Sequence, residues 1–564
     1  MKKWYSLLCF TGFWLVPVGA AVWIGFCKCM EPETAVTEGM LFMGAKIGFC
    51  GMLYALLVNL FTQANGKHPL RDYRALDFLQ LEKDAWVHST NKSKAKYPEI
   101  PADLLRKPSA SSNSIIIGEQ GGKLVCIGLK PGVANHMLVE GLTGSAKTSG
   151  ILLPTLQSID STDASGKVLL THVSVDIKLE LWEKAADQTI VTGKNQEPAN
   201  ILLNPKDRTS WGYDVFYDIR QAQEPQQVYD AIATVVETLI PVRKSDRNSY
   251  FYERARDLMK GFLLAYWDYG VTGFIGMVNE ISSSPLREQI KSLKENIPGS
   301  RGCRILTMFD GMPEETFGCV SDNMFNAISF FANNHDVQYL LSGNPQKANP
   351  SMLEDHNLYL GVPEHMIEQY SPLLNLMITQ CMEYILKRPE NSHPILVCVD
   401  ELGAIIAKAG PIKALNTFLM TARSRGGVFL GIMQQCDVLN EAYGKDMAQG
   451  ILGNMNYRVI LSASSEQTCK DIIRLAGKYE ENQRSHGTTG KGKSANYSRQ
   501  EKDILTSNDL LTLPKQGEVV VISSADGYFR PRKTAYYRQP YLKKRWISIQ
   551  EKNAAWKNIQ ETGR

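Results

Sequence analysis

The segment 138–150 places glycines, a lysine and a hydroxyl group in the order that phosphate binding requires. It reads Leu-Val-Glu-Gly-Leu-Thr-Gly-Ser-Ala-Lys-Thr-Ser-Gly. In such a loop, backbone N–H groups surround the phosphates, the lysine neutralises them and the hydroxyl binds Mg2+. Alanine stands at 146, where the usual pattern has a second glycine. The spacing predicts ATP and Mg2+ as ligands. The predicted binding residues are Gly141, Thr143, Gly144, Ser145, Ala146, Lys147, Thr148 and Ser149.

A second motif supplies the carboxylates that phosphoryl transfer to water needs. The apolar run Ile395–Val399 has the composition of a buried strand and ends in Asp400-Glu401. An aspartate at such a strand end holds magnesium through its water shell, and a neighbouring glutamate polarises the attacking water. We therefore predict Thr148 and Asp400 at the metal and Glu401 in catalysis. An Asp-Glu pair in a solvated turn is the alternative, which the presence of both motifs in this order disfavours.

The elements around these motifs alternate between strands and helices from about residue 114. Expected strands are 115–117, 124–129, 137–139, 168–175, 358–362, 395–399, 428–433, 457–462 and 518–523. Strands separated by helical stretches indicate an α/β fold with a mainly parallel sheet covered on both faces. Ligands bind at the carboxyl ends of such strands. The phosphate loop, Asp176, Asp400 and Gln434 all follow expected strands.

The pattern becomes helical between about 220 and 350, which predicts an all-helical insertion. Residues 484–500 are rich in Gly, Ser and Lys and are expected to form a mobile loop. The expected divisions are a transmembrane hairpin (1–65), a linker (66–113), the first part of the nucleotide-binding domain (114–264), the all-helical insertion (265–340), the second part of the nucleotide-binding domain (341–545) and a polar C-terminal tail (546–564).

Two apolar runs near the N-terminus are each long enough to cross a bilayer. They cover 5–27 and 39–63, the second containing Lys46. Lysines precede the first run, basic residues follow the second, and the connector carries three glutamates. The positive-inside rule therefore predicts a multi-pass membrane protein with both ends, and so the ATPase domain, in the cytoplasm and a short hairpin outside. A cleaved signal peptide is the alternative, but it leaves the second run unexplained.

Charge and cysteine usage limit other classes of function. The net charge of +4 over 564 residues does not by itself indicate a nucleic-acid protein, so any DNA contact must come from local patches. The eleven cysteines are scattered without CxxC pairs, which disfavours a disulfide framework or a zinc site. No HisGluXaaXaaHis helix is present, which disfavours a metalloprotease.

The chain resembles the coupling proteins of bacterial type IV secretion and conjugation, the TraG/TraD-like membrane ATPases. The resemblance rests on the two spans, both nucleotide motifs and the helical insertion. It also includes short motifs in the family's order: AspIleLysLeuGluLeuTrp at 176–182, AsnPro at 204–205, AlaArgSerArgGly at 422–426, GlnGln at 434–435 and a late LysThrAlaTyrTyr strand at 533–537. The chain departs from the family at Ala146, and at Ile177 and Leu179, where many members read Asp-Pro-Lys-Gly.

The resemblance implies a hexameric motor with a RecA-like P-loop ATPase core. It would use ATP to drive single-stranded DNA with its relaxase, or protein effectors, into a channel of secretion-system membrane proteins. By the same resemblance Gln434 senses the γ-phosphate, and Arg423 or Arg425 acts as an arginine finger in a neighbouring subunit. Asp176 and Lys178 either contact nucleotide or only fix a strand end.

Three questions stay open at this level. Residues 243–256 mix basic and aromatic side chains, which suits single-stranded DNA but equally an amphipathic helix. A double-stranded DNA translocase of the cell-division type is an alternative to the secretion motor. A substrate-docking receptor with a decayed ATP site is another, favoured only by Ala146.

Overall fold

The computed structural model describes residues 99–562, apart from 109–112, 131, 134, 193–196, 243–248, 464–465 and 490–491. The predicted membrane hairpin (1–65) and most of the predicted linker (66–113) lie outside the described residues. Within the described ranges, no helix combines the length and the apolar character that crossing a bilayer requires. Residues 480–500 belong to a compact unit separate from the rest of the described chain and are treated by themselves.

In the described chain, nine strands form a central sheet in the order β16-β15-β12-β4-β11-β10-β5-β9-β6. The strands from β12 to β6 are parallel, and β15 and β16 add antiparallel pairs at one edge. The mainly parallel sheet is therefore as predicted. Their bounds are β4 Met137–Glu140, β5 Thr171–Asp176, β6 Asn200–Leu203, β9 Asn357–Gly361, β10 Ile395–Val399, β11 Gly427–Met433, β12 Tyr457–Ile460, β15 Val520–Ser523 and β16 Gly527–Phe529.

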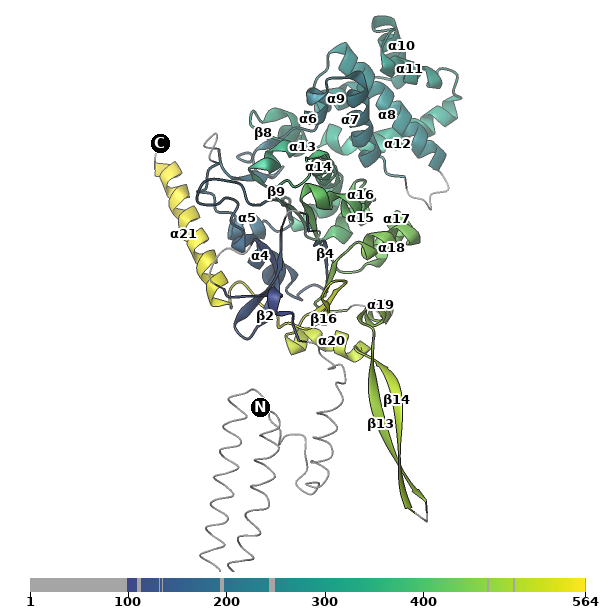
Figure 1. Ribbon diagram of the computed structural model, residues 1–564. Helices are drawn as coiled ribbons and strands as arrows, with labels where there is room; N and C mark the ends of the chain where they lie inside the picture. The colour runs from purple at the N-terminus through teal and green to yellow at the C-terminus, as the bar shows by residue number, and fades with distance from the viewer. Residues whose placement is uncertain are drawn as a thin grey trace, which may run out of the picture. The chain divides into compact units, whose positions relative to one another are not determined.

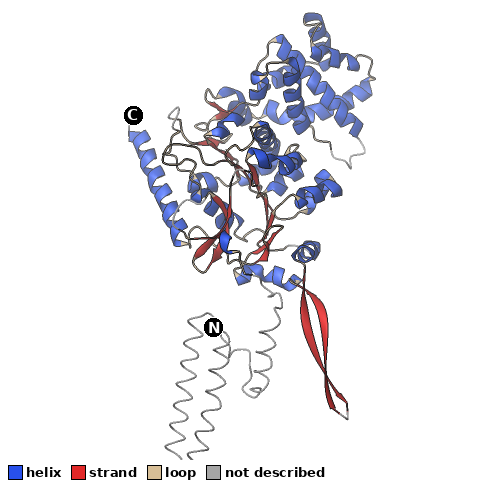
Figure 2. Ribbon diagram, viewed as in Figure 1, coloured by secondary structure: helices blue, strands red, loops and turns tan. Residues whose placement is uncertain are grey.

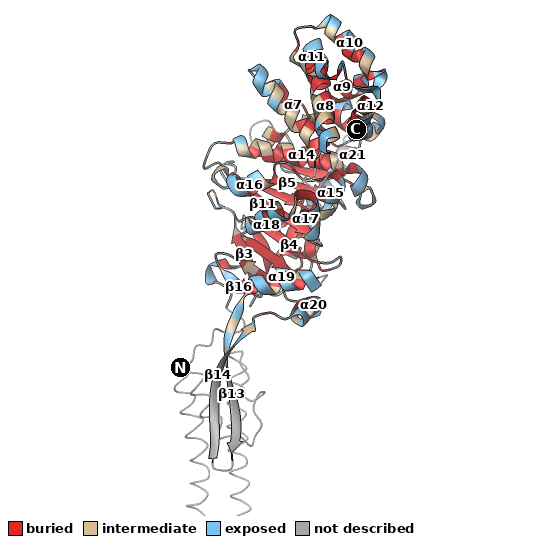
Figure 3. Ribbon diagram, turned by 90° about the vertical axis from the view of Figure 1, so that its right-hand side faces the viewer, coloured by how far each residue is buried: buried red, intermediate tan, exposed pale blue. Residues whose placement is uncertain are grey.

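Both faces of this sheet are covered, so most of its strands are buried along their whole length rather than at alternate residues. In β10, Val397 packs into one hydrophobic cluster, while Leu396 and Cys398 pack into the other. Figure 3 shows the strands as a continuous buried layer. The first cluster contains α14 (Ile367–Lys387), α15 (Leu402–Ala409) and α16 (Leu415–Thr421). The second contains α4 (Leu153–Ser158), α5 (Glu180–Ala185) and the small sheet of β1 (Leu105–Arg106), β2 (Ser114–Gln120) and β3 (Lys123–Gly128).

A continuous helical region follows β7 (Gly212–Tyr213) and ends before β8 (Lys347–Ala348) (Figures 1 and 2). Because β7 and β8 pair in parallel, the chain enters and leaves this region at one place. The expected start of the insertion at 265 falls inside α8, so the helical region begins earlier than expected. Its helices are α6 Tyr217–Gln221, α7 Pro225–Leu239, α8 Ser249–Tyr269, α9 Phe274–Ser283, α10 Leu286–Asn296, α11 Arg301–Leu306, α12 Glu314–Asn333 and α13 His335–Gln338.

Three expectations for the C-terminal third need correction. Residues 484–500 form most of a two-stranded sheet, β13 (Lys478–Thr489) and β14 (Gly492–Asp503), rather than a loop. The segment 533–537 is not a strand. The segment expected as a polar tail, 546–564, forms most of α21 (Pro540–Thr562), which packs on α4 and α5. The remaining helices are α17 Asp437–Tyr443, α18 Lys445–Gly453, α19 Glu466–Ala476 and α20 Ser507–Gln516.

Candidate nucleotide-binding site

The loop from Gly141 to Lys147 joins β4 to a short π-helix, η2 (Thr148–Leu152), that leads into α4. The Gly141 N–H donates to the Met433 carbonyl on β11 (3.2 Å), and the Leu142 N–H donates to the Ser462 hydroxyl (2.8 Å). The Lys147 Nζ donates hydrogen bonds to the carbonyls of Gly141 (2.8 Å) and Leu142 (3.2 Å). The loop is therefore closed around a buried ammonium group.

Two structural details of this loop suit the binding of a phosphate group. A Cβ at Gly141 would come within 2.5 Å of the Ser145 hydroxyl oxygen, so only glycine leaves the turn tight enough. The same hydroxyl is buried and has no hydrogen-bond partner in the structure. Thr143 and Gly144 are exposed at the rim, and Ser149 is half-buried at the start of η2. An orphaned donor beside backbone N–H groups is what a bound phosphate oxygen would satisfy.

Ala146 occupies a backbone conformation that explains why this position usually holds glycine. Its φ is +72°, in the left-handed region, and Gly144 has a φ of +79°. A Cβ atom makes that conformation unfavourable by about 1–2 kcal/mol. The loop therefore keeps its shape despite the alanine, and the substitution stores strain rather than changing the path of the chain.

Replacing Ala146 with glycine is expected to stabilise the nucleotide-free protein by about 1 kcal/mol, because the left-handed strain disappears. Urea denaturation of the full-length protein measures the change. Gly144→Ala is the matched control, since nothing lies within 4 Å of a Cβ there and only backbone strain is added. It should destabilise by a similar amount, and equal signs for the two variants would contradict the strain argument.

The predicted catalytic side chains meet at the carboxyl ends of three adjacent strands, β4, β11 and β10. The Thr148 hydroxyl donates to Asp400 Oδ2 (3.3 Å). Glu401 forms an ion pair with Lys147 (3.7 Å) and accepts hydrogen bonds from Gln434 Nε2 on both carboxylate oxygens (3.2 Å each). Glu401 itself has a left-handed φ of +56°, an unusual conformation of the kind that active sites retain.

Burial raises the pKa values of the two aspartates at the carboxyl ends of the strands. Asp400 is buried, and desolvation together with the charges of Glu401 and Asp176 raises its pKa from 3.8 to about 7. Burial also raises the pKa of Asp176 to about 6, although the Trp182 N–H donates to its carboxylate (2.7 Å). The site therefore concentrates more negative charge than its lysine neutralises, which favours a divalent cation.

The raised pKa of Asp400 gives the stability of the metal-free protein a defined pH dependence. Because the folded state holds the proton more tightly than the unfolded state, this stabilisation is complete below pH 3.8 and is lost as pH rises through about 7. Asp400→Asn should therefore raise the melting temperature at pH 8 and flatten its decrease between pH 6 and pH 8. A variant that melts below the wild type at pH 8 would contradict the burial argument.

The two arginines that are candidates for an arginine finger lie at the amino ends of the strands, whereas the phosphate loop lies at their carboxyl ends. Both belong to η7 (Ala422–Arg425), directly before β11, whereas Gln434 directly follows that strand. The seven residues of β11 separate its two ends by about 20 Å. Arg423 is exposed, and its Nε donates to the Gly132 carbonyl (2.6 Å). Neither arginine can reach the phosphate loop of its own subunit.

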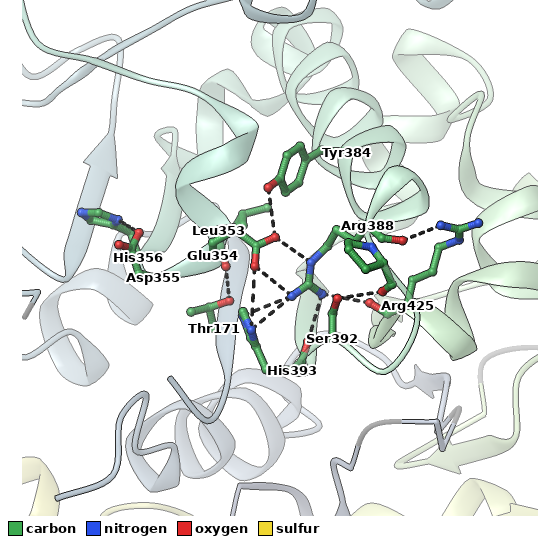
Figure 4. A network of polar contacts seen from close by, with 11 residues as sticks. Thr171, Leu353, Glu354, Asp355, His356, Tyr384, Arg388, Ser392, His393 and Arg425 are labelled. Carbon is green, nitrogen blue, oxygen red and sulfur yellow. Dashed lines mark hydrogen bonds and ion pairs between the residues drawn. The ribbon is translucent and has the colours of Figure 1, made fainter. Parts of the chain in front are cut away.

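Arg425 differs from Arg423 because a partly buried polar network holds it (Figure 4). Its guanidinium donates to the Arg388 carbonyl, and Arg388 Nη1 donates back to the Arg425 carbonyl (2.9 Å). Arg388 also binds Glu354 through Nε (2.7 Å) and Nη2 (3.2 Å). Burial alone would raise the pKa of Glu354, but the Arg388 hydrogen bonds and charge hold it below its usual value. Of the two arginines, Arg423 is the one free to meet another subunit.

Sequence patterns did not identify some residues that hold the loop. Glu140, the last residue of β4, accepts a hydrogen bond from Arg458 Nε on β12 (2.6 Å) and one from the Cys436 thiol (3.2 Å). The buried ion pair joins β4 to β12, and the thiol hydrogen bond joins β4 to the segment after Gln434. Two charged residues inside otherwise apolar strands were the signal that could have indicated it.

The remaining candidates lie apart from the loop or are only partly described. Lys178 forms an exposed ion pair with Glu364 (3.1 Å). In the basic-aromatic segment, 243–248 is not described and the rest begins α8. Arg256 Nε there donates to the Ile240 carbonyl (2.7 Å), and Tyr252 packs against the core. These contacts describe a helix face, while DNA contact by this segment stays a prediction.

The strand order β4-β11-β10-β5, with the phosphate loop after β4 and the carboxylates at the ends of β10 and β5, defines a RecA-like α/β ATPase fold. The family model described as "Type IV secretory system Conjugative DNA transfer" matches residues 90–559, and the chain belongs to this family. The resemblance predicted from the sequence is confirmed. The roles of the individual site residues stay predictions.

Curated relatives and solved structures agree with this assignment. Protein VirD4 of Rhizobium radiobacter is 23% identical over 437 residues, which cover 74% of this chain and 59% of that protein. Protein VirD4 of Rhizobium rhizogenes is 22% identical over 437 residues, covering 74% and 60%. The chain thus matches about three fifths of the length of these relatives.

Structures of the plasmid coupling protein TrwB share the fold. The complex with the non-hydrolysable ATP analogue ADPNP has a TM-score of 0.58 at 17% identity, covering 78% of this chain and 93% of that chain. The complex with ADP and Mg2+ has a TM-score of 0.57 at 17% identity, covering 79% and 95%.

Proposed function

We propose that this protein is a coupling ATPase that hydrolyses ATP to drive substrate into a type IV secretion channel. The proposal rests on five residues that converge at the carboxyl ends of β4, β11 and β10. They are Lys147, Thr148, Asp400, Glu401 and Gln434. The family assignment and the ADP–Mg2+ complex of TrwB support the choice of ATP and Mg2+.

Each side chain has a role that follows from its position. Lys147 would exchange its two loop carbonyls for the phosphates, and Thr148 with Asp400 would hold Mg2+. Bound Mg2+ would neutralise phosphate charge. Glu401, released from the Lys147 ion pair, would orient and deprotonate the attacking water, while Gln434 fixes the Glu401 carboxylate.

The substrate and the assembly are proposed on the family relationship. The cargo is single-stranded DNA attached to a relaxase, or a protein effector, and the partners are membrane proteins of the secretion channel. The subunits form a homo-hexamer. The position of Arg423 before β11 requires a neighbouring subunit, of whatever number, if this arginine completes a neighbour's site. Residues 1–65 anchor the protein in the bacterial inner membrane, with the ATPase domain in the cytoplasm. Membrane fractionation with and without these residues tests the anchor.

ATP hydrolysis by the full-length protein, measured with and without single-stranded DNA, tests the proposed function. Turnover that rises with single-stranded DNA supports the motor. Stimulation by double-stranded DNA alone would instead favour a translocase of the cell-division type. Tight ATP binding without hydrolysis in either condition would favour a docking receptor.

A further inference from the structure

The segment 531–538, here called the clasp, runs across the phosphate loop and the first turn of η2. The Arg532 carbonyl accepts from the Glu119 N–H (2.9 Å), which ties the clasp to β2. The Tyr536 N–H donates to the Ser149 carbonyl (3.1 Å). A Cβ at Gly150 would lie 2.8 Å from the Thr534 carbonyl oxygen, so the clasp and η2 are in direct backbone contact.

Lys533 is the clasp residue that reaches the loop with its side chain. Its Nζ donates to the Ser145 carbonyl (3.2 Å) and to the Leu461 carbonyl (3.3 Å). The side chain is half-buried, and burial lowers its pKa. None of the ion pairs found among the described residues neutralises this ammonium group. A lysine ammonium has three N–H donors, so two carbonyls leave one donor available.

The hydrogen bond from Lys533 to the Ser145 carbonyl lies next to the strained residue of the loop. Ser145 directly precedes Ala146, whose left-handed φ carries the strain of a Cβ atom. A hydrogen bond from a charged donor is stronger than one between neutral groups. Holding the Ser145 carbonyl therefore offsets strain that would otherwise let the loop relax away from its phosphate-binding shape.

We propose that Lys533 is a positioning residue of the nucleotide site, which holds Ser145 and Ala146 in the phosphate-binding conformation and adds a second positive charge beside the phosphates. This inference rests on the proposed ATP-binding function and deepens it. The ligand it favours is a nucleoside diphosphate or triphosphate, because its charge lies against the loop that cradles the α- and β-phosphates.

The clasp is itself anchored, so that Lys533 is held on a fixed support. Tyr536 packs edge-on against Trp546 of α21, with ring centroids 5.0 Å apart. On α21, Arg545 pairs with Asp160 (3.0 Å), and Asn553 accepts a hydrogen bond from the Gln188 N–H (2.9 Å). Loop conformation is thereby linked to the docking of α21.

The test is binding of a fluorescent ADP analogue to the full-length protein and its variants. Lys533→Met keeps the length of the side chain but removes the charge and the donors, and should weaken binding about tenfold. Lys533→Arg should recover most of the affinity. Lys543→Met, which removes an exposed lysine of α21, is the matched charge control and should change affinity less than twofold. Equal losses in the 533 and 543 methionine variants would overturn the proposal.

A double-mutant cycle with Ala146→Gly separates positioning of the loop from general support of the fold. A glycine loop populates the left-handed conformation freely, so the loss caused by Lys533→Met should shrink from about tenfold to about threefold. Additive effects would overturn the positioning role. Absence of binding by the wild type would instead contradict the proposed function, which keeps the two failures distinguishable.

Discussion

Replacing Lys147 with alanine is expected to lower ATP turnover by about a hundredfold or more, without unfolding the protein. The lysine is the buried cation of the phosphate loop, and its ammonium contacts Gly141 and Leu142. Removing it leaves the backbone cradle but deletes the charge that faces the transferred phosphoryl group. Steady-state phosphate release, with a thermal melt to check folding, measures the effect.

Two further variants make this result specific. Lys543→Ala removes a lysine outside the site and should keep wild-type turnover, which controls for the loss of one charge. Glu401→Gln retains the metal-binding aspartate but loses the base, so ATP should be bound and not hydrolysed. Turnover near the wild-type rate in purified Lys147→Ala protein would remove the basis of the site assignment.

Two inactive proteins are expected to regain activity when they are mixed. Arg423→Ala keeps an intact phosphate loop, and Lys147→Ala keeps an intact arginine. Arg423 lies at the amino ends of the strands and Lys147 at their carboxyl ends. A catalytic role for Arg423 therefore requires a neighbouring subunit. A mixed oligomer contains some interfaces that pair an intact arginine with an intact loop, and each of these can hydrolyse ATP.

The matched experiment uses Arg425→Ala with the same Lys147→Ala partner. Arg425 is held by Arg388 within its own subunit, so its loss should disturb that network rather than remove a finger. Mixing should then restore less activity than with Arg423→Ala. If mixed oligomers are demonstrated by differential tags and neither pair recovers turnover, a finger supplied in trans at these positions is wrong.

Most strands of the central sheet were predictable because they are largely apolar runs with both faces buried, but the short strands β6 and β16 were not predicted. The element formed by β13 and β14 was not, since its residues are polar and glycine-rich and show no alternation that a buried face would impose. α21 was missed for a related reason. Its buried positions include Leu542, Ile549 and Asn553, too few apolar residues to give a helical period.

Some residues of the site can be predicted from local spacing, whereas others depend on contacts between residues far apart in the sequence. Gly141, Lys147 and Thr148 are fixed by local spacing, and Asp400 by the strand that it follows. The support of the loop comes from Ser462 and Lys533, hundreds of residues away, whose partners are backbone groups. A backbone carbonyl has no residue identity, so one sequence contains no sign of such a pair.

These distant contacts set the order in which the site is completed during synthesis on the ribosome. The phosphate loop emerges early, but Asp400, Ser462 and Tyr536, which contact it through Thr148, Leu142 and Ser149, emerge much later. A nascent chain that ends before residue 400 carries the loop without the carboxylates that serve it. The proposed ATP hydrolysis therefore cannot begin until the residues that close the site have been made, and a chain terminated before residue 400 would lack the proposed activity.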